Sequence, residues 1–87
     1  MLVVFSSDRF LKTAAKLPAN QQEKLADLLE TLRKNPFDPQ LHTKHLTGKL
    51  SGLYSFRITR DWRVIFRFLS PQEILLVNVD HRKDVYR

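Results

Sequence analysis

The sequence contains no cysteine among its 87 residues. Disulfide bonds, cysteine catalysis and thiolate metal sites are therefore excluded. No apolar run approaches the roughly 20 residues that a membrane helix needs, and the first residues lack the length and basic flank of a signal peptide. We therefore expect a cytoplasmic protein without a membrane partner.

Acidic residues are scarce in the second half of the chain. Residues 1–39 contain six Lys/Arg and five Asp/Glu, whereas residues 40–87 contain nine Lys/Arg and four Asp/Glu. The second half therefore carries +5 of the net charge of +6. Such a basic half indicates a polyanionic partner, either a nucleic acid or an acidic protein. Charge alone is equally compatible with a basic surface that has no specific partner.

The length predicts a single domain, residues 1–87, with a modest two-layer core. Residues 2–6 form a short apolar run that predicts a strand. Ser7 can cap a following helix, and Pro18 interrupts its apolar stripe. Pro18 and Asn20 both suit the start of a second helix, which is expected up to Asn35-Pro36, and Glu23 lies three residues after Asn20 in a variant of the capping box.

The remainder of the chain predicts three strands, at about 53–59, 62–69 and 73–80. The connection before them, residues 35–52, contains three leucines that can anchor it to the body. The last strand is almost continuously apolar from Ile74 to Val79, which is typical of an interior strand contacted on both faces. The order β-α-α-β-β-β predicts an α+β fold, with a two-helix hairpin packed on one face of a small, mainly antiparallel sheet.

The segment "GLYSFRITRDWRVIFRF", residues 52–68, alternates apolar residues with arginines. Successive side chains of a strand point to opposite faces, so the even-numbered aromatic and aliphatic residues face the helices. Both strands satisfy this only if the hairpin loop has an odd number of residues, for example Thr59-Arg60-Asp61. Arg57 then lies opposite Arg63, and both point into the open face of the sheet.

Directly opposed like charges destabilise a strand pair by up to about 1 kcal/mol. A sequence tolerates this cost if an anion binds at the site, and we favour this interpretation. Alternatively, the two guanidinium groups splay apart into water or reach Asp80 or Glu73.

The last nine residues, "VDHRKDVYR", bring a histidine, an arginine and a tyrosine to one end of the sheet. Histidine suits proton transfer near neutral pH, and arginine can hold a phosphate. Taken singly each signal is weak, because a histidine near a strand end is more often structural and a C-terminal tyrosine more often packs. We expect His81 and Tyr86 to lie around the same sheet face as Arg57 and Arg63.

The stretches "HLTGKLSGLYSFRITRDWRVIFRF" and "VNVDHRKDVYR" resemble the RelE/ParE superfamily of toxins from type II toxin–antitoxin systems. The resemblance is closest to the ribosome-dependent mRNA endonucleases of the RelE and YoeB type. It implies a RelE-like fold and cleavage of mRNA in the ribosomal A site. In that reaction the ribose 2′-hydroxyl attacks its own 3′-phosphate and the 5′-oxygen leaves, with no metal or other cofactor.

The resemblance also implies roles for particular residues. Arg57 and Arg63 would bind the scissile phosphate, His81 would transfer a proton, and Tyr86 would orient the nucleotide. His42 and His45 are reserve candidates for the base, and Ser55 stands where RelE itself has a lysine. The candidate RNA-binding residues are Lys44, His45, Lys49, Arg60, Arg67 and Arg82. The three dispersed histidines lack the spacing of metal ligands, so no metal site is expected.

The implied partners are a cognate antitoxin protein, mRNA and the ribosome. Two other functions remain open. A member of the ParE branch would share the fold but inhibit DNA gyrase by binding, without nuclease activity. An inactive relative would only bind an antitoxin.

Overall fold

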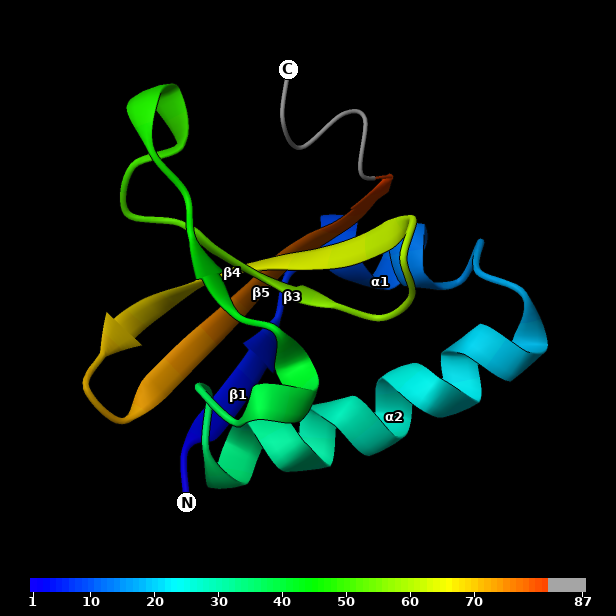
Figure 1. The fold of residues 1–87 in the computed structure, drawn as a ribbon, viewed down its shortest axis with the longest axis horizontal. Coiled ribbons are helices and arrows are strands. Elements are labelled where there is room, and N and C mark those ends of the chain that lie inside the picture. The colour runs from blue at the N-terminus through cyan, green and yellow to red at the C-terminus, as the bar shows by residue number, and fades with distance from the viewer. Residues whose placement is uncertain (82–87) are drawn as a thin grey trace.

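Residues 1–81 are described by a computed structural model of the chain. The predicted order β-α-α-β-β-β is confirmed, and the connection between the second helix and the hairpin contains one more strand (Figure 1). The elements are β1 (Val3–Ser6), α1 (Asp8–Ala14), α2 (Ala19–Lys34), the 3-10 turn η1 (Pro39–Leu41), β2 (Lys44–His45), the 3-10 turn η2 (Gly48–Leu50), β3 (Tyr54–Arg57), β4 (Trp62–Ser70) and β5 (Glu73–His81).

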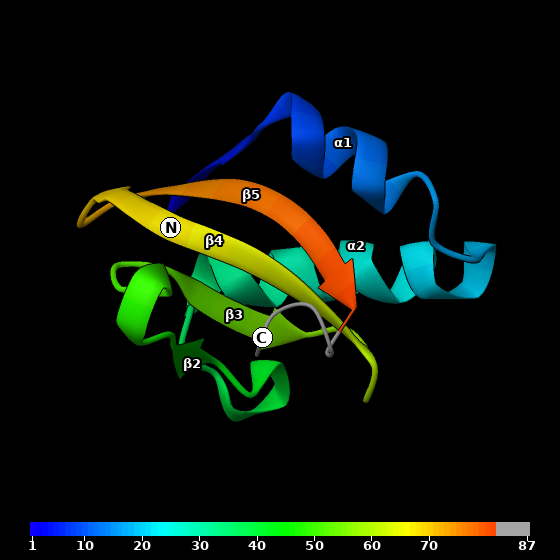
Figure 2. The ribbon, with the colours of Figure 1, turned by 90° about the horizontal axis from the view of Figure 1, so that it is seen from above.

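The five strands form one sheet in the order β1-β5-β4-β3-β2. β1 pairs with β5 in parallel, and all other neighbours are antiparallel. β5 is an interior strand, as its continuous apolar run predicts. Seen from above, the strands cross over α2, and α1 lies beside β5 (Figure 2). Within residues 1–81, no helix is long and apolar enough to cross a membrane.

The main core lies between the helices and the even-numbered side chains of the hairpin. Phe56, Val64 and Phe66 are completely buried against Leu32 from α2 and Ile74 from β5. The predicted helix-side face of β3 and β4 is therefore confirmed. Burial of this apolar surface is the main term that stabilises the fold, since each large apolar side chain contributes about 1.5–3 kcal/mol.

The two helices begin in different ways. Ser7 caps α1 as predicted, because its hydroxyl accepts a hydrogen bond from the Phe10 N–H at 3.0 Å. The capping box predicted at Asn20 is wrong: the N-cap of α2 is Pro18, and no side chain caps it. Instead, the side-chain Nε2 of Gln22 donates to the Leu17 carbonyl at 2.9 Å and links the first turn of the helix to the preceding turn.

The face of the sheet opposite the helices is not fully open, contrary to expectation. The segment 46–53 folds back on itself, with the Leu46 N–H donating to the Leu53 carbonyl at 2.9 Å. Leu46 and Ile65 form a second small apolar cluster there, which Leu50, Leu53 and Val77 extend. This cluster covers part of the face on which the arginines lie.

Candidate nucleic-acid interface

The two arginines of the hairpin lie directly opposite each other. Arg57 of β3 pairs with Arg63 of β4, and the Ile58 N–H donates to the Trp62 carbonyl at 3.0 Å, which leaves the predicted three-residue loop. The Cβ atoms of directly opposed residues are about 4.5–5.5 Å apart. Both side chains therefore leave the sheet on the same face, as the alternation predicts.

Their exposure differs, and this corrects the expectation that both are exposed. Arg63 of the interior strand β4 is only 2% exposed. Arg57 is half-buried. Its Nε atom is buried and has no hydrogen-bond partner in the described part of the chain. Arg57 is consequently the arginine of this pair with the greater access to solvent.

A carboxylate completes this row across the sheet. Asp80 of β5 lies directly opposite Arg63, on the side away from Arg57. We call Arg57, Arg63 and Asp80 the arginine row. The acid offsets one of the two positive charges, and Arg57 at the other end of the row keeps a positive charge at the margin of the face.

A second row, which contains three polar residues and one isoleucine, lies next to the arginine row. Lys44 of β2 pairs with Ser55, Ser55 pairs with Ile65, and Ile65 pairs with Asn78. We call these four residues the serine row. Ser55 is 0% exposed and Asn78 is 5% exposed. Buried polar side chains are costly unless they have partners, so their presence here marks the face as a candidate site.

Of the polar residues in the serine row, the sequence predicted an RNA-binding role only for Lys44. It predicted no role for Asn78 or for Ser55. A signal for Ser55 exists, because strand alternation places it on the same face as Arg57. No such signal exists for Asn78, because its face depends on a bulge in β5.

The expectation that His81 lies on the arginine face is wrong. A register shift between Ile65 and Phe66 leaves Val77 of β5 as an extra residue without a partner in β4. Every later residue of β5 is turned to the other face, since the side-chain period is two. His81 is therefore opposite Trp62, and their rings are 5.1 Å apart at 82°. Because Trp62 packs against the main core, this histidine lies on the helix side.

On the side away from β4, the end of β5 is held by α1 and its N-cap rather than by a strand. β1 pairs with β5 only as far as Leu76. Beyond it, the Ser7 hydroxyl donates to the Val77 carbonyl at 2.6 Å, and the Val79 N–H donates to the Thr13 hydroxyl oxygen at 2.9 Å. These two bonds replace missing strand partners at the bulge. They therefore support the part of β5 that contains Asp80, whose register with Arg63 comes from the pairing with β4.

The other predicted site residues are dispersed. Arg67 is exposed on the arginine face of β4, opposite Leu75. His45 pairs with Tyr54, with ring centroids 4.8 Å apart, and this places it on the opposite face. The remaining described candidates are exposed outside the sheet strands, Arg60 in the hairpin loop, Lys49 in η2 and His42 at the end of η1. Arg82 and Tyr86 lie outside the described residues.

The described residues contain no group of three or more His, Cys, Asp or Glu side chains that could hold a metal ion. The arrangement on the arginine face instead offers guanidinium and hydroxyl donors. Such groups bind anionic oxygens, and arginine is the residue best suited to phosphate.

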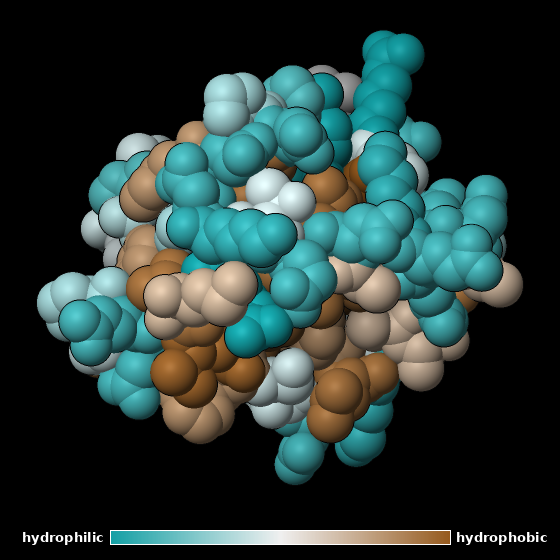
Figure 3. Space-filling model, turned by 90° about the horizontal axis from the view of Figure 1, so that it is seen from below, coloured by the Kyte–Doolittle hydropathy of each residue, from teal (hydrophilic) through white to brown (hydrophobic). Residues whose placement is uncertain are grey.

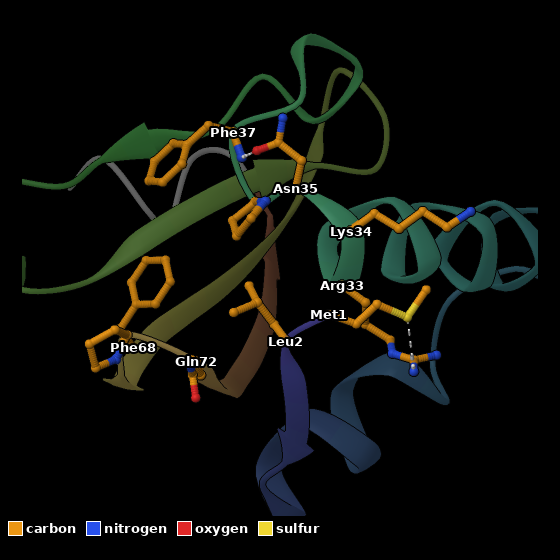
Figure 4. Close-up of a pocket in the computed structure, with 10 residues that line it drawn as sticks. Met1, Leu2, Arg33, Lys34, Asn35, Phe37, Phe68 and Gln72 are labelled. Atoms are coloured by element: carbon orange, nitrogen blue, oxygen red, sulfur yellow. Dashed lines mark hydrogen bonds between the residues drawn. The ribbon is translucent and has the colours of Figure 1, made fainter.

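A pocket of about 380 Å³ lies elsewhere, between the end of α2 and the β4–β5 turn. The rings of Phe37 and Phe68 and the side chain of Leu2 surround it, and the Phe37 N–H donates to the Asn35 side chain at 3.0 Å (Figure 4). The surface on the side of the N-terminus shows apolar patches between hydrophilic groups (Figure 3). No residue of the arginine row or the serine row lines this pocket, so it is separate from the candidate interface.

A family model described as the ParE toxin of the type II toxin–antitoxin system parDE matches residues 4–86. The chain belongs to this toxin family. No curated protein sequence gives a significant match. The resemblance to the RelE/ParE superfamily is thus confirmed, as is the fold that it implies.

Solved structures of similar fold are toxins of the RelE, YoeB and ParE types. A YoeB/ParE toxin from Agrobacterium tumefaciens is 21% identical, with a TM-score of 0.79 over 93% of this chain and 99% of that one. A copper-bound mutant toxin from Helicobacter pylori is 26% identical, with a TM-score of 0.78 over 98% and 99%. The toxin–antitoxin complex RelBE2 from Mycobacterium tuberculosis contains a chain that is 22% identical, with a TM-score of 0.77 over 93% and 98%.

Proposed function

We propose that this toxin is a metal-independent endoribonuclease that cleaves mRNA, with the ribosomal A site as its place of action. The observation that carries the proposal is the pairing of Arg57 with Arg63 on the polar face of the sheet. Two opposed guanidinium groups destabilise the free protein and are stabilised by an anion between or beside them. The YoeB-type and RelE-type relatives support RNA as the source of that anion.

In the proposed reaction, the ribose 2′-oxygen bonds to the adjacent phosphorus and the bond from phosphorus to the 5′-oxygen breaks. The products are a 2′,3′-cyclic phosphate and a 5′-hydroxyl end. The 2′-hydroxyl loses its proton and the 5′-oxygen gains one, so no oxidant or metal is consumed. Arg57 would contact the phosphate, and Arg63 behind it would stabilise the negative charge that grows on the phosphate oxygens.

His81 has no part in this step as we propose it, because its ring packs against Trp62 on the other face. Asp80 is the carboxylate in register with the arginines, and we assign it the role of proton acceptor in this proposal. Arg82 and Tyr86 keep the roles that the resemblance implies, as predictions.

The proposed partner in the cell is a cognate antitoxin. Membership of a type II toxin family and the RelBE2 complex support this partner. An acidic antitoxin segment would be attracted to the basic second half of the chain.

A second function is favoured by the family model, which carries the name of ParE. In that case the toxin would bind DNA gyrase and would not cut RNA.

One experiment distinguishes the two functions: purified protein is incubated with programmed ribosomes, with free RNA, and with gyrase and relaxed plasmid. Message cut on ribosomes supports the nuclease. Intact message together with inhibited supercoiling would contradict the nuclease and support a gyrase inhibitor. No effect in any reaction would indicate an inactive relative.

A further inference from the structure

The hydroxyl of Ser55 is buried without a hydrogen-bond partner. Its side chain is 0% exposed, and its Oγ atom makes no hydrogen bond within residues 1–81. The Nε atom of Arg57 is in the same condition. The two residues are separated by one position on β3, so they leave the same face about 6.6 Å apart along the strand. Unsatisfied buried donors destabilise a folded protein, and each one needs an explanation.

The neighbours of this hydroxyl do not include a carboxylate on the adjoining strands. Lys44 lies directly opposite Ser55 in β2, and Ile65 lies opposite it in β4. Asp80 is on β5, two strands away and beyond Arg63. The charged residue next to Ser55 across the sheet is therefore a cation, which suits an incoming anionic oxygen, whereas Ile65 on the other side belongs to the small apolar cluster.

We propose that Ser55 is an RNA-binding residue whose hydroxyl, together with Arg57 Nε, donates a hydrogen bond to a phosphate oxygen of the RNA strand. This inference rests on the proposed function and adds to the arginines a neutral donor on the adjacent row. A phosphate has several oxygens, so two donors on one face can bind the same phosphate group, and the RNA backbone supplies such a group at every nucleotide.

Ser55 is covered in the free protein, so RNA reaches it only after neighbouring side chains move. Lys44 is exposed and Arg57 is half-buried, and both border the hydroxyl on the same face. Both are long, flexible cations that a phosphate attracts. Their movement toward the RNA backbone would uncover the hydroxyl and satisfy both donors at once.

The inference predicts that Ser55→Ala has opposite effects on stability and on activity. Removing an unsatisfied buried hydroxyl leaves the melting temperature of the free protein unchanged or raises it. Losing one hydrogen bond to a charged phosphate slows cleavage about ten-fold or more. A hydroxyl with a purely structural role would lower the melting temperature instead.

The matched control is Ser70→Ala. Ser70 is on β4, the strand next to Ser55 in the same sheet, but at the end away from Arg63, where its hydroxyl accepts a bond from the Gln72 N–H at 3.3 Å. This variant should cleave at the rate of the unmodified protein.

The experiment measures single-turnover cleavage of message on programmed ribosomes and, separately, thermal unfolding of each toxin without RNA. Slower cleavage by Ser55→Ala with an undiminished melting temperature supports the inference. Cleavage at the unmodified rate, or a melting temperature lowered by several degrees, overturns it while leaving the proposed nuclease intact. If the unmodified protein itself does not cut message, the proposed function and this inference both fail.

Discussion

The two faces of the β3–β4 hairpin use alternate residues of the same segment for different purposes. The even-numbered side chains Phe56, Val64 and Phe66 are completely buried against the helices. The odd-numbered side chains Ser55, Arg57 and Arg63 point to the other face, where polar groups are buried without a large apolar layer. The first face accounts for stability, and the second concentrates groups that reduce stability. Such a conflict between packing and polarity is expected at a functional site.

The polar side chains on the second face differ in how deeply they are buried. A small cluster around Leu46 and Ile65 adjoins the serine row and the arginine row. Arg63 is almost as buried as the core residues, whereas Arg57 is only half-buried. Substitution of Arg57 should therefore lower activity with little change in stability. Substitution of Arg63 should lower both.

The largest effect on stability is expected on the helix side. Leu28→Ala in α2 removes a side chain that is 7% exposed and leaves a cavity in the main core. We expect the free energy of unfolding to fall by about 2–5 kcal/mol, measured by chemical denaturation. The cleavage rate of the remaining folded protein should not change.

The control for this variant is Leu11→Ala in α1, which truncates a leucine that is 56% exposed. Its free energy of unfolding should change by no more than about 0.5 kcal/mol. Equal losses from both leucines would show that the helix-side core is not the source of stability.

The largest effect on activity is expected on the polar face. Arg57→Ala removes a half-buried guanidinium that we assign to the phosphate, so single-turnover cleavage on ribosomes should slow by about 10²–10³. The melting temperature should change little, because the buried Nε loses no partner within the described chain. Arg67→Ala, an exposed arginine farther along the same face, is the control and should slow cleavage only a few-fold. A fully active Arg57→Ala protein would remove the arginine row from the reaction.

A smaller effect is expected where α1 holds the end of β5. Thr13→Val keeps the shape of the side chain but removes the oxygen that accepts the Val79 N–H bond. An unsatisfied N–H at this site should lower the free energy of unfolding by about 1–3 kcal/mol. Thr13→Ser retains the oxygen and should lose less. If the serine variant is as unstable as the valine variant, the hydroxyl does not hold the strand.

Much of this arrangement follows from local sequence signals. Alternation in residues 52–68 predicts the helix-side core and requires an odd number of loop residues, and the three-residue loop taken as the example gives the pairing of Arg57 with Arg63. Ser7 and Pro18 mark the two helix starts for local steric and hydrogen-bonding reasons. The two-residue strand β2 escapes prediction, because its pairing with β3 depends on contacts and not on a periodic pattern.

The parts of the candidate site that could not be predicted depend on single residues or on distant segments. One extra residue, Val77, reverses the faces of all later positions in β5, so His81 turns to the helices and Asp80 joins the arginines. An apolar strand carries no alternation that would reveal such a bulge. The burial of Arg63 has no local signal either, because Arg67 lies on the same face of the same strand and is exposed.

The most direct test of the central claim is a double-mutant cycle on single-turnover cleavage of ribosome-bound message. The cycle compares Arg57→Ala, Arg63→Met and the double variant, with methionine chosen to keep much of the buried volume of Arg63. If both guanidinium groups act on one phosphate, the double variant should lose far less than the product of the two single losses. Losses that multiply, as for independent residues, would contradict the assignment of both arginines to one phosphate.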